Sequence, residues 1–255
     1  MKYKNLIVTK NGGIQKVVVN RPEVRNALNR ETLNEIIDMA RTLDDDVRAL
    51  IFTGLDKSFV SGADVKELNT MSLLEYRQFN IDTFMTMDSV LRDLPIPTIA
   101  AVNGYCFGGG IALALPCDFI IASEKAKFGQ PEINVGIFAG SAYLTALVGR
   151  IRAAEIVFTG RAITAQEAYD WNLITKVVPH DELEGEARKL AESLIKMPPI
   201  ALAFAKKSIN ITMGTAWGSA AEYEAEMRVI CFSTEDQKEG MQAFQEKRPP
   251  VFKGY

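Results

Sequence analysis

The chain has 255 residues, 47% of them apolar, and its 29 basic and 32 acidic side chains give a formal net charge of −3. This length and apolar content suffice for one large domain or two small ones with a full hydrophobic core. A slight negative charge disfavours binding to nucleic acid or to an anionic membrane surface. No apolar run approaches the ~20 residues of a membrane span and no signal peptide is evident, so we expect a cytoplasmic protein.

Two residue counts exclude common catalytic sites. The chain has one histidine, His180, and three cysteines, none of them in Cys-x-x-Cys spacing. One histidine excludes His-rich metal sites, and this cysteine pattern disfavours a disulfide framework and a thiolate zinc site. We therefore expect no metal, and chemistry by carboxylates, lysines, hydroxyls or backbone amides.

Strand and helix patterns alternate over the first 140 residues. Two β-rich runs, 6–8 and 14–19, flank Asn11-Gly12-Gly13, which is a strong hairpin signal. Apolar runs at 49–53, 98–102 and 118–122 predict buried strands, and helical patterns occupy 29–43, 72–94 and a short segment that opens at 108–110. This alternation predicts an α/β architecture.

The rest of the chain is mostly helical, apart from a strand-like run at 173–178. The last predicted helices cover 201–211, 218–232 and 234–247. Met197-Pro198-Pro199 is the best candidate for a boundary. We therefore divide the chain into residues 1–197 and a separate helical region, residues 198–255.

Two glycine segments expose backbone amides at predicted helix starts. Gly62 and Ala63 precede Asp64 and a helical run, and Gly108-Gly109-Gly110 opens a short apolar helix. Two such amides, one from each loop, are what an oxyanion hole requires. The alternative is that both segments are tight turns whose small residues serve packing.

Nucleotide and hydrolase motifs do not fit these glycines. A dinucleotide-binding fingerprint would need glycine at position 113, where Leu113 stands, and no P-loop Gly-Lys-Ser/Thr follows. Gly140-Ser141 lacks the pattern of a nucleophile elbow because position 143 is tyrosine. The amides are therefore expected to serve something other than nucleotide phosphates.

A third segment places one carboxylate in apolar surroundings. Glu132 follows Gly129-Gln130-Pro131. If the side chain is partly desolvated, it can act as a general base. The alternative is a solvent-exposed glutamate at a helix start.

In this order and spacing, the segments resemble the crotonase superfamily, the enoyl-CoA hydratase/isomerase family. The resemblance runs nearly from end to end and rests on seven stretches: Arg21–Leu28, Ser61–Leu68, Ala100–Gly110, Phe128–Glu132, Thr159–Ala168, Val177–Pro179 and Ala243–Phe252. It implies a spiral of ββα units in residues 1–197 that binds acyl-CoA and carries catalysis. It also implies that residues 198–255 drive assembly into trimers, or into pairs of trimers.

The resemblance assigns roles to single residues. The amides of Ala63 and Gly109 would hold the thioester carbonyl, and Glu132 would move the proton. Coenzyme A would be part of the substrate, with no metal or redox cofactor. The residues matched to the coenzyme A side are Arg25, Ala27, Leu28, Ala63, Asp64, Lys66 and Lys247.

Three expected acyl-pocket positions depart from the family pattern. Ala112 stands where the two-glutamate hydratases carry their other glutamate, and Gly140 stands where some isomerases and dehalogenases carry aspartate. Tyr143 replaces a usual glycine, and it either supplies a hydroxyl or fills space. A proton shift needs one base, whereas syn-hydration is easier with two carboxylates that orient one water.

Several activities remain open from the sequence. A hydratase of unusual acyl groups and a double-bond isomerase both fit a single glutamate. The same scaffold also supports thioester hydrolysis, carbon–carbon bond cleavage, or a non-catalytic acyl-CoA-binding subunit.

Overall fold

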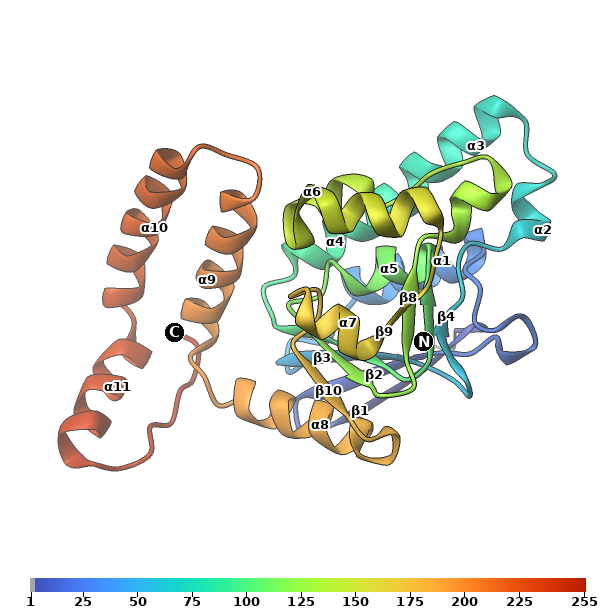
Figure 1. Cartoon of the computed structure of the whole chain (residues 1–255). Helices are drawn as coiled ribbons and strands as arrows, with labels where there is room; N and C mark the ends of the chain where they lie inside the picture. The colour runs from blue at the N-terminus through green and yellow to red at the C-terminus, as the bar shows by residue number, and fades with distance from the viewer. Residues whose placement is uncertain (1–2) are drawn as a thin grey trace.

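Two sheets form the framework of the computed structural model, which describes residues 3–255 (Figure 1). The larger sheet has six strands in the order β1-β2-β3-β5-β7-β10, and the smaller has the order β4-β6-β8-β9. The large-sheet strands are β1 Leu6–Asn11, β2 Ile14–Val19, β3 Ala49–Gly54, β5 Thr98–Val102, β7 Phe119–Ser123 and β10 Lys176–Val178. The small-sheet strands are β4 Ser58–Val60, β6 Tyr105–Phe107, β8 Lys127–Gly129 and β9 Ile163–Thr164.

Strand pairing confirms the predicted hairpin and α/β layering. Strands β1 and β2 pair antiparallel around Gly12 and Gly13, which both have positive φ. Strands β2, β3, β5, β7 and β10 then pair in parallel. Each central large-sheet strand is followed by a short strand of the small sheet and then by helix, as in β3–β4–α2 and β5–β6–α5. This repeat is the expected spiral of ββα units.

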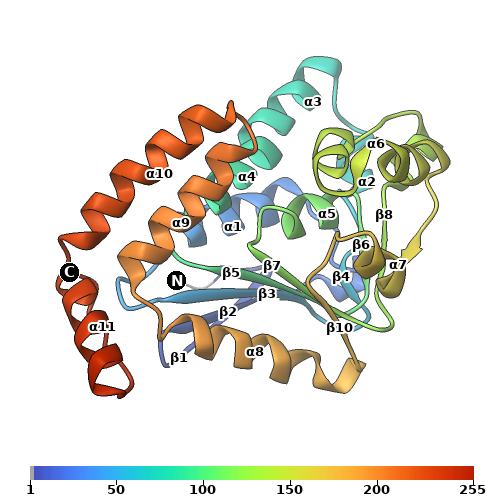
Figure 2. The same ribbon diagram turned by 60° about the vertical axis from the view of Figure 1, so that its left-hand side comes forward.

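Helices cover both faces of the large sheet (Figure 2). Helix α8, Leu183–Leu194, packs on one face, and α1 Arg30–Arg41, α4 Thr86–Asp93 and α5 Gly109–Ala114 pack on the other. The remaining helices of the body are α2 Val65–Leu68, α3 Leu73–Asn80, α6 Ser141–Thr159 and α7 Ala165–Asp170, with 3₁₀ turns η1 Pro22–Val24, η3 Pro131–Val135 and η4 His180–Glu182. No helix within residues 3–255 is long and apolar enough to cross a membrane.

The helix predicted over 72–94 is continuous but contains a wide π turn. This turn, η2 Ile81–Met85, lies between α3 and α4. Ser72 begins the helix with a capping box, because its side chain accepts from the Glu75 N–H and Glu75 bonds back to the Ser72 N–H. A π turn widens a helix locally and often occurs at functional sites.

The C-terminal arm comprises α9 Pro199–Thr212, α10 Trp217–Phe232 and α11 Glu235–Glu246, and it stands beside the body (Figure 1). Lys206 of α9 fixes it to the large sheet by donating to Asp118 Oδ2 at 2.9 Å and to the Ile96 carbonyl at 3.1 Å. Lys206 is only 7% exposed. The arm is therefore held by an ion pair whose lysine is buried, although much of its surface is open to solvent.

We expect Lys206→Met to destabilise the protein by about 2 kcal/mol, because Asp118 and the Ile96 carbonyl then lose a charged donor that comes from a buried side chain. The control is Lys207→Met, since Lys207 pairs with Asp93 at 2.8 Å on the exposed surface. That pair should contribute less than about 1 kcal/mol. Chemical denaturation of both variants measures the difference, and equal losses would contradict this account of the anchor.

Candidate active site

The first predicted oxyanion loop follows strand β4 and is held by a parallel bridge between Leu28 and Ala63. The Leu28 N–H donates to the Gly62 carbonyl at 2.9 Å, and the Asp64 N–H donates to the Leu28 carbonyl at 2.8 Å. This pairing uses the Gly62 carbonyl and the Asp64 N–H and leaves the Ala63 N–H without a hydrogen bond in the described chain. The Ala63 amide is thus fixed in place and available to a ligand.

A buried arginine ties this loop to the segment that precedes α1. Arg21 donates to the Ala27 carbonyl at 2.5 Å and to Asp64 Oδ2 at 2.9 Å. Asp64 also caps α2 by accepting from the Lys66 N–H at 3.1 Å. The carboxylate of Asp64 therefore serves the loop itself.

Two consecutive left-handed residues, Arg25 and Asn26, shape the same segment, with φ of 53° and 60°. The Asn26 amide donates to the carbonyls of Leu55 and Ser58, and its oxygen accepts from the Arg21 N–H. Asparagine tolerates this conformation better than most residues. Sequence reasoning assigned no role to Asn26, although its place between Arg21 and Leu28 in the motif was a signal.

The second predicted oxyanion loop packs directly against the first. A Cβ on Gly109 would lie 3.2 Å from the Ala63 nitrogen, and one on Gly110 would lie 2.3 Å from the Val60 carbonyl oxygen. At position 110 only glycine allows this approach of backbone to backbone, whereas at position 109 a Cβ would make a tight contact. The start of α5, where the Gly109 N–H has no hydrogen bond within residues 3–255, therefore lies beside the Ala63 amide.

Glu132 completes the group at the beginning of the η3 turn. A Cβ on Gly108 would lie 2.0 Å from Glu132 Oε1, so the carboxylate rests against the bare Gly108 backbone. Gly108 also has a φ of 49°, which favours glycine independently. The structure thus brings Ala63, Gly109 and Glu132 together from three separate ββα units.

The surroundings of Glu132 suit a general base. Burial raises the pKa of this carboxyl, and a backbone hydrogen bond partly offsets that effect. Within residues 3–255, no charged side chain forms an ion pair with it. No cation therefore offsets the effect of burial on this carboxylate.

The three pocket positions have different environments. Ala112 is partly buried and lies three residues after Gly109 on the same face of α5, where it presents only a methyl group. Gly140 begins α6 with a φ of 68°. The Tyr143 hydroxyl donates to Asp88 and accepts from Arg92 Nε at 2.7 Å. Tyr143 therefore does more than fill space, and its hydroxyl is already engaged by Asp88 and Arg92.

The expected coenzyme-side residues do not all meet in one chain. Lys66 is exposed on α2, close in sequence to Ala63 and Asp64. Lys247 ends α11, and both views place α11 at the opposite end of the molecule from α2 (Figures 1 and 2). Lys247 therefore cannot join the other coenzyme-side residues within one protomer.

Phe84 borders the two amides and was missed by sequence reasoning. Its Cε1 lies 3.3 Å from where a Cβ on Gly109 would stand, and its ring packs edge-on against Phe79 with centroids 5.7 Å apart. The π turn presents Phe84 at this place. A single apolar residue in a long helical pattern gave no signal of this.

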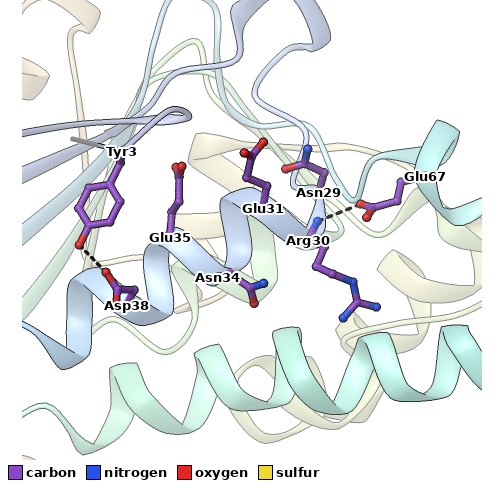
Figure 3. A pocket seen from close by; sticks show the side chains of 8 residues that line it. All are labelled: Tyr3, Asn29, Arg30, Glu31, Asn34, Glu35, Asp38 and Glu67. Atoms are coloured by element: carbon purple, nitrogen blue, oxygen red, sulfur yellow. Dashed lines mark hydrogen bonds between the residues drawn. The ribbon is translucent and has the colours of Figure 1, made fainter. Parts of the chain in front are cut away.

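A hollow of about 590 Å³ runs along the start of α1 (Figure 3). Four carboxylates line it, and several already have partners: Asp38 accepts from Tyr3, and Glu67 accepts from the Arg30 N–H. This negative lining would repel the phosphates of coenzyme A. The hollow therefore does not extend the candidate site.

Comparisons with known proteins show the family of the chain. A family model described as enoyl-CoA hydratase/isomerase matches residues 9–255. The crotonyl-CoA hydratase of Syntrophomonas wolfei is 41% identical over 99% of both chains, and the short-chain-enoyl-CoA hydratase of Clostridium acetobutylicum is 41% identical over 97% of both. The crystal structure of an enoyl-CoA hydratase from Bacillus anthracis is 35% identical, with a TM-score of 0.94 over 99% of this chain and 100% of that one. The chain therefore belongs to the enoyl-CoA hydratase/isomerase family.

Proposed function

We propose that this protein hydrates the double bond of an enoyl-CoA at a site with two backbone amides and one carboxylate. The observation that carries the proposal is the meeting of the Ala63 and Gly109 amides beside Glu132. The names of the relatives support hydration as the reaction.

The two amides would hold the thioester carbonyl oxygen. When a nucleophile adds at the β-carbon, negative charge accumulates on this oxygen as the enolate forms. Donors that are already in position stabilise that charge without reorganising, and losing one typically costs about 10²–10³ in rate.

Glu132 would carry out both proton transfers of the reaction. Its carboxylate takes a proton from water while the water oxygen bonds to the β-carbon, and it then returns the proton to the α-carbon as the enolate collapses. One water is consumed and the carboxylate is regenerated. Burial raises the pKa of Glu132 toward neutral pH, and a general base is most efficient when its pKa is near the operating pH.

Coenzyme A would be held along one edge of the site, as part of the substrate and without a further cofactor. Residues Arg25, Ala27 and Leu28 would line its adenine and pantetheine portions beside the backbone of Ala63 and Asp64, and Lys66 would approach the phosphates. Lys247 would then come from the arm of another copy of the chain, because its own arm lies at the far end.

We propose that residues 1–197 carry substrate binding and catalysis and that residues 198–255 form the oligomerisation region. The arm exposes large apolar side chains, including Trp217 at 80% and Phe244 at 84%. Such surfaces are typical of protein interfaces. The expected assembly is a trimer or a pair of trimers in the cytoplasm.

Double-bond isomerisation is the second candidate, and the methyl of Ala112 favours it. An isomerase moves one proton along the acyl chain and needs no second carboxylate to orient water. Mass spectrometry of products from straight and cyclic unsaturated acyl-CoAs separates the candidates. Added water indicates a hydratase, and an unchanged mass with altered absorbance indicates an isomerase. Free coenzyme A indicates a hydrolase, and a shortened acyl group indicates carbon–carbon cleavage. No turnover indicates a binding subunit.

Glu132→Gln should lower turnover at least about 100-fold with little change in acyl-CoA affinity, because it removes the base but keeps the shape. The same change should raise the melting temperature at pH 7. Since burial raises the pKa of Glu132, ionising it above its unfolded pKa of about 4.3 costs folding stability, and the glutamine avoids this cost. The gap should close as the pH falls below that value. Turnover within a few-fold of wild type would assign the chemistry to another residue.

Ala112→Glu should raise crotonyl-CoA hydration a few-fold, because it restores a second carboxylate to orient water. The gain is limited because a newly buried carboxylate has a raised pKa. Ala112→Gln is the matched control, with the same size and no charge. If wild type already hydrates crotonyl-CoA as fast as its best substrate and the added glutamate slows it, the single-carboxylate site is wrong.

Light scattering should show a trimer or hexamer at micromolar concentration, and Trp217→Glu should weaken the assembly by placing a charge on the arm's apolar surface. A stable wild-type monomer would contradict the assembly and also the contribution of Lys247 to a neighbour's site.

A further inference from the structure

We propose that Gln130 positions the catalytic carboxylate of Glu132, and that Tyr143 fixes the helix start against which Gln130 packs. The inference rests on the proposed role of Glu132 as the base. It assigns work to two residues that touch neither the thioester carbonyl nor the reacting carbons.

Gln130 is a buried polar side chain aimed at the base. It is only 2% exposed and immediately precedes the η3 turn that carries Glu132. With its amide oriented so that both ends meet suitable partners, its nitrogen lies 3.0 Å from Glu132 Oε2 and 3.2 Å from Oε1. The amide thus donates to the carboxylate and favours its charged form in an apolar setting.

Gly140 supplies the space that Gln130 occupies. A Cβ on Gly140 would lie 1.9 Å from the far end of the Gln130 amide. An aspartate at position 140 and the present placement of Gln130 therefore exclude each other. Gly140 thus leaves room for the Gln130 side chain, and it also suits the φ of 68° at this position.

Tyr143 anchors α6 in its first turn, three residues after Gly140. Its hydroxyl bonds to Asp88 and Arg92 of α4, and the Arg92 guanidinium lies over its ring, 4.5 Å from the centroid. Asn210 of α9 donates to the Arg92 carbonyl at 2.9 Å. The start of α6 is thereby fastened to α4, and α4 to the arm.

This anchor matters because the intervening segment is loosely held. Residues 133–138 are all exposed, including Val135 at 70% and Phe138 at 71%. Besides turns within the segment, Ile133 and Asn134 lie against Gly160 at the end of α6. The rest of its position depends on its two ends. Gln130 lies at one end, and Gly140 with Tyr143 lies at the other.

The charged groups in this region form one closed cluster. On α4, Asp88 pairs with Arg92 at 3.3 Å, and both bond to Tyr143 of α6. Burial, reinforced by Asp88, raises the pKa of Tyr143 to about 12, so its hydroxyl stays protonated near neutral pH. Neither Asp88 nor Arg92 bonds to Glu132 in the described chain, which leaves Gln130 as the side chain whose loss changes the Glu132 titration directly.

The test compares Gln130→Met, Tyr143→Phe and the double variant with the exposed control Thr145→Ala on α6, using the acyl-CoA that wild type converts fastest. Gln130→Met should lower kcat at least 10-fold, with KM within about two-fold, and should move the acid limb of the kcat profile to higher pH. Tyr143→Phe should have the same effects to a smaller degree. The double variant should lose less than the product of the two single losses, and Thr145→Ala should match wild type.

A purely structural role predicts a lower melting temperature with an unchanged pH profile, and that result would overturn the proposal. If Gln130→Met does not fold, the pH profile of Tyr143→Phe decides the matter. Glu132→Gln is measured alongside. If it retains activity, the proposed function is wrong. If it is inactive while Gln130→Met keeps the wild-type kcat and profile, only the positioning role is wrong.

Discussion

The site depends on a contact between two stretches of backbone that side chains would prevent. The first turn of α5 meets the loop after β4 so closely that a Cβ on Gly109 or Gly110 would touch main-chain atoms of residues 60–63. This approach places two N–H groups from different ββα units side by side before any substrate arrives. Their orientation is fixed by folding, so in the proposed reaction a developing enolate would meet donors that need no rearrangement. Arg21 secures the same loop from its other side by joining Ala27 to Asp64.

The glycine that borders these two N–H groups also accommodates Glu132, the proposed base. Gly108 lies under the Glu132 carboxylate, so the distance between oxyanion donors and base is fixed by one short segment. Two opposing influences then set the basicity of Glu132. Burial raises its pKa, while the proposed hydrogen bond from Gln130 favours its charged form. The methyl of Ala112 adds no charge to this balance, so one carboxylate and one amide carry it.

Helices and strands with strong local sequence signals were predicted correctly, whereas contacts between residues far apart in the chain were not predicted. The Asn11-Gly12-Gly13 hairpin, the α1 periodicity and the buried strand β5 follow from neighbouring residues, and the structure confirms them. The small sheet was missed because its strands have two or three residues, too few to show alternation. The glycine segments indicated free amides, but the partners Arg21 and Asp64 are 43 residues apart and meet only in the folded chain. Likewise, the sequence could not show that a wide turn carries Phe84 to Gly109, or that Tyr143 reaches across to α4.

The way the arm is attached explains how it can expose so much apolar surface. A flexible arm bearing Trp217 and Phe244 would gain free energy by folding back onto its own body. Lys206 opposes this, because its buried ammonium is satisfied only where Asp118 and the Ile96 carbonyl meet it. At the C-terminus, Asp236 accepts from the Lys253 and Gly254 amides and ties the tail to α11. Polar contacts with strict geometry thus hold the arm away from the body, and the apolar residues stay available for the proposed neighbour. The same network reaches the start of α6, since Asn210 of the arm contacts Arg92, and Arg92 holds Tyr143.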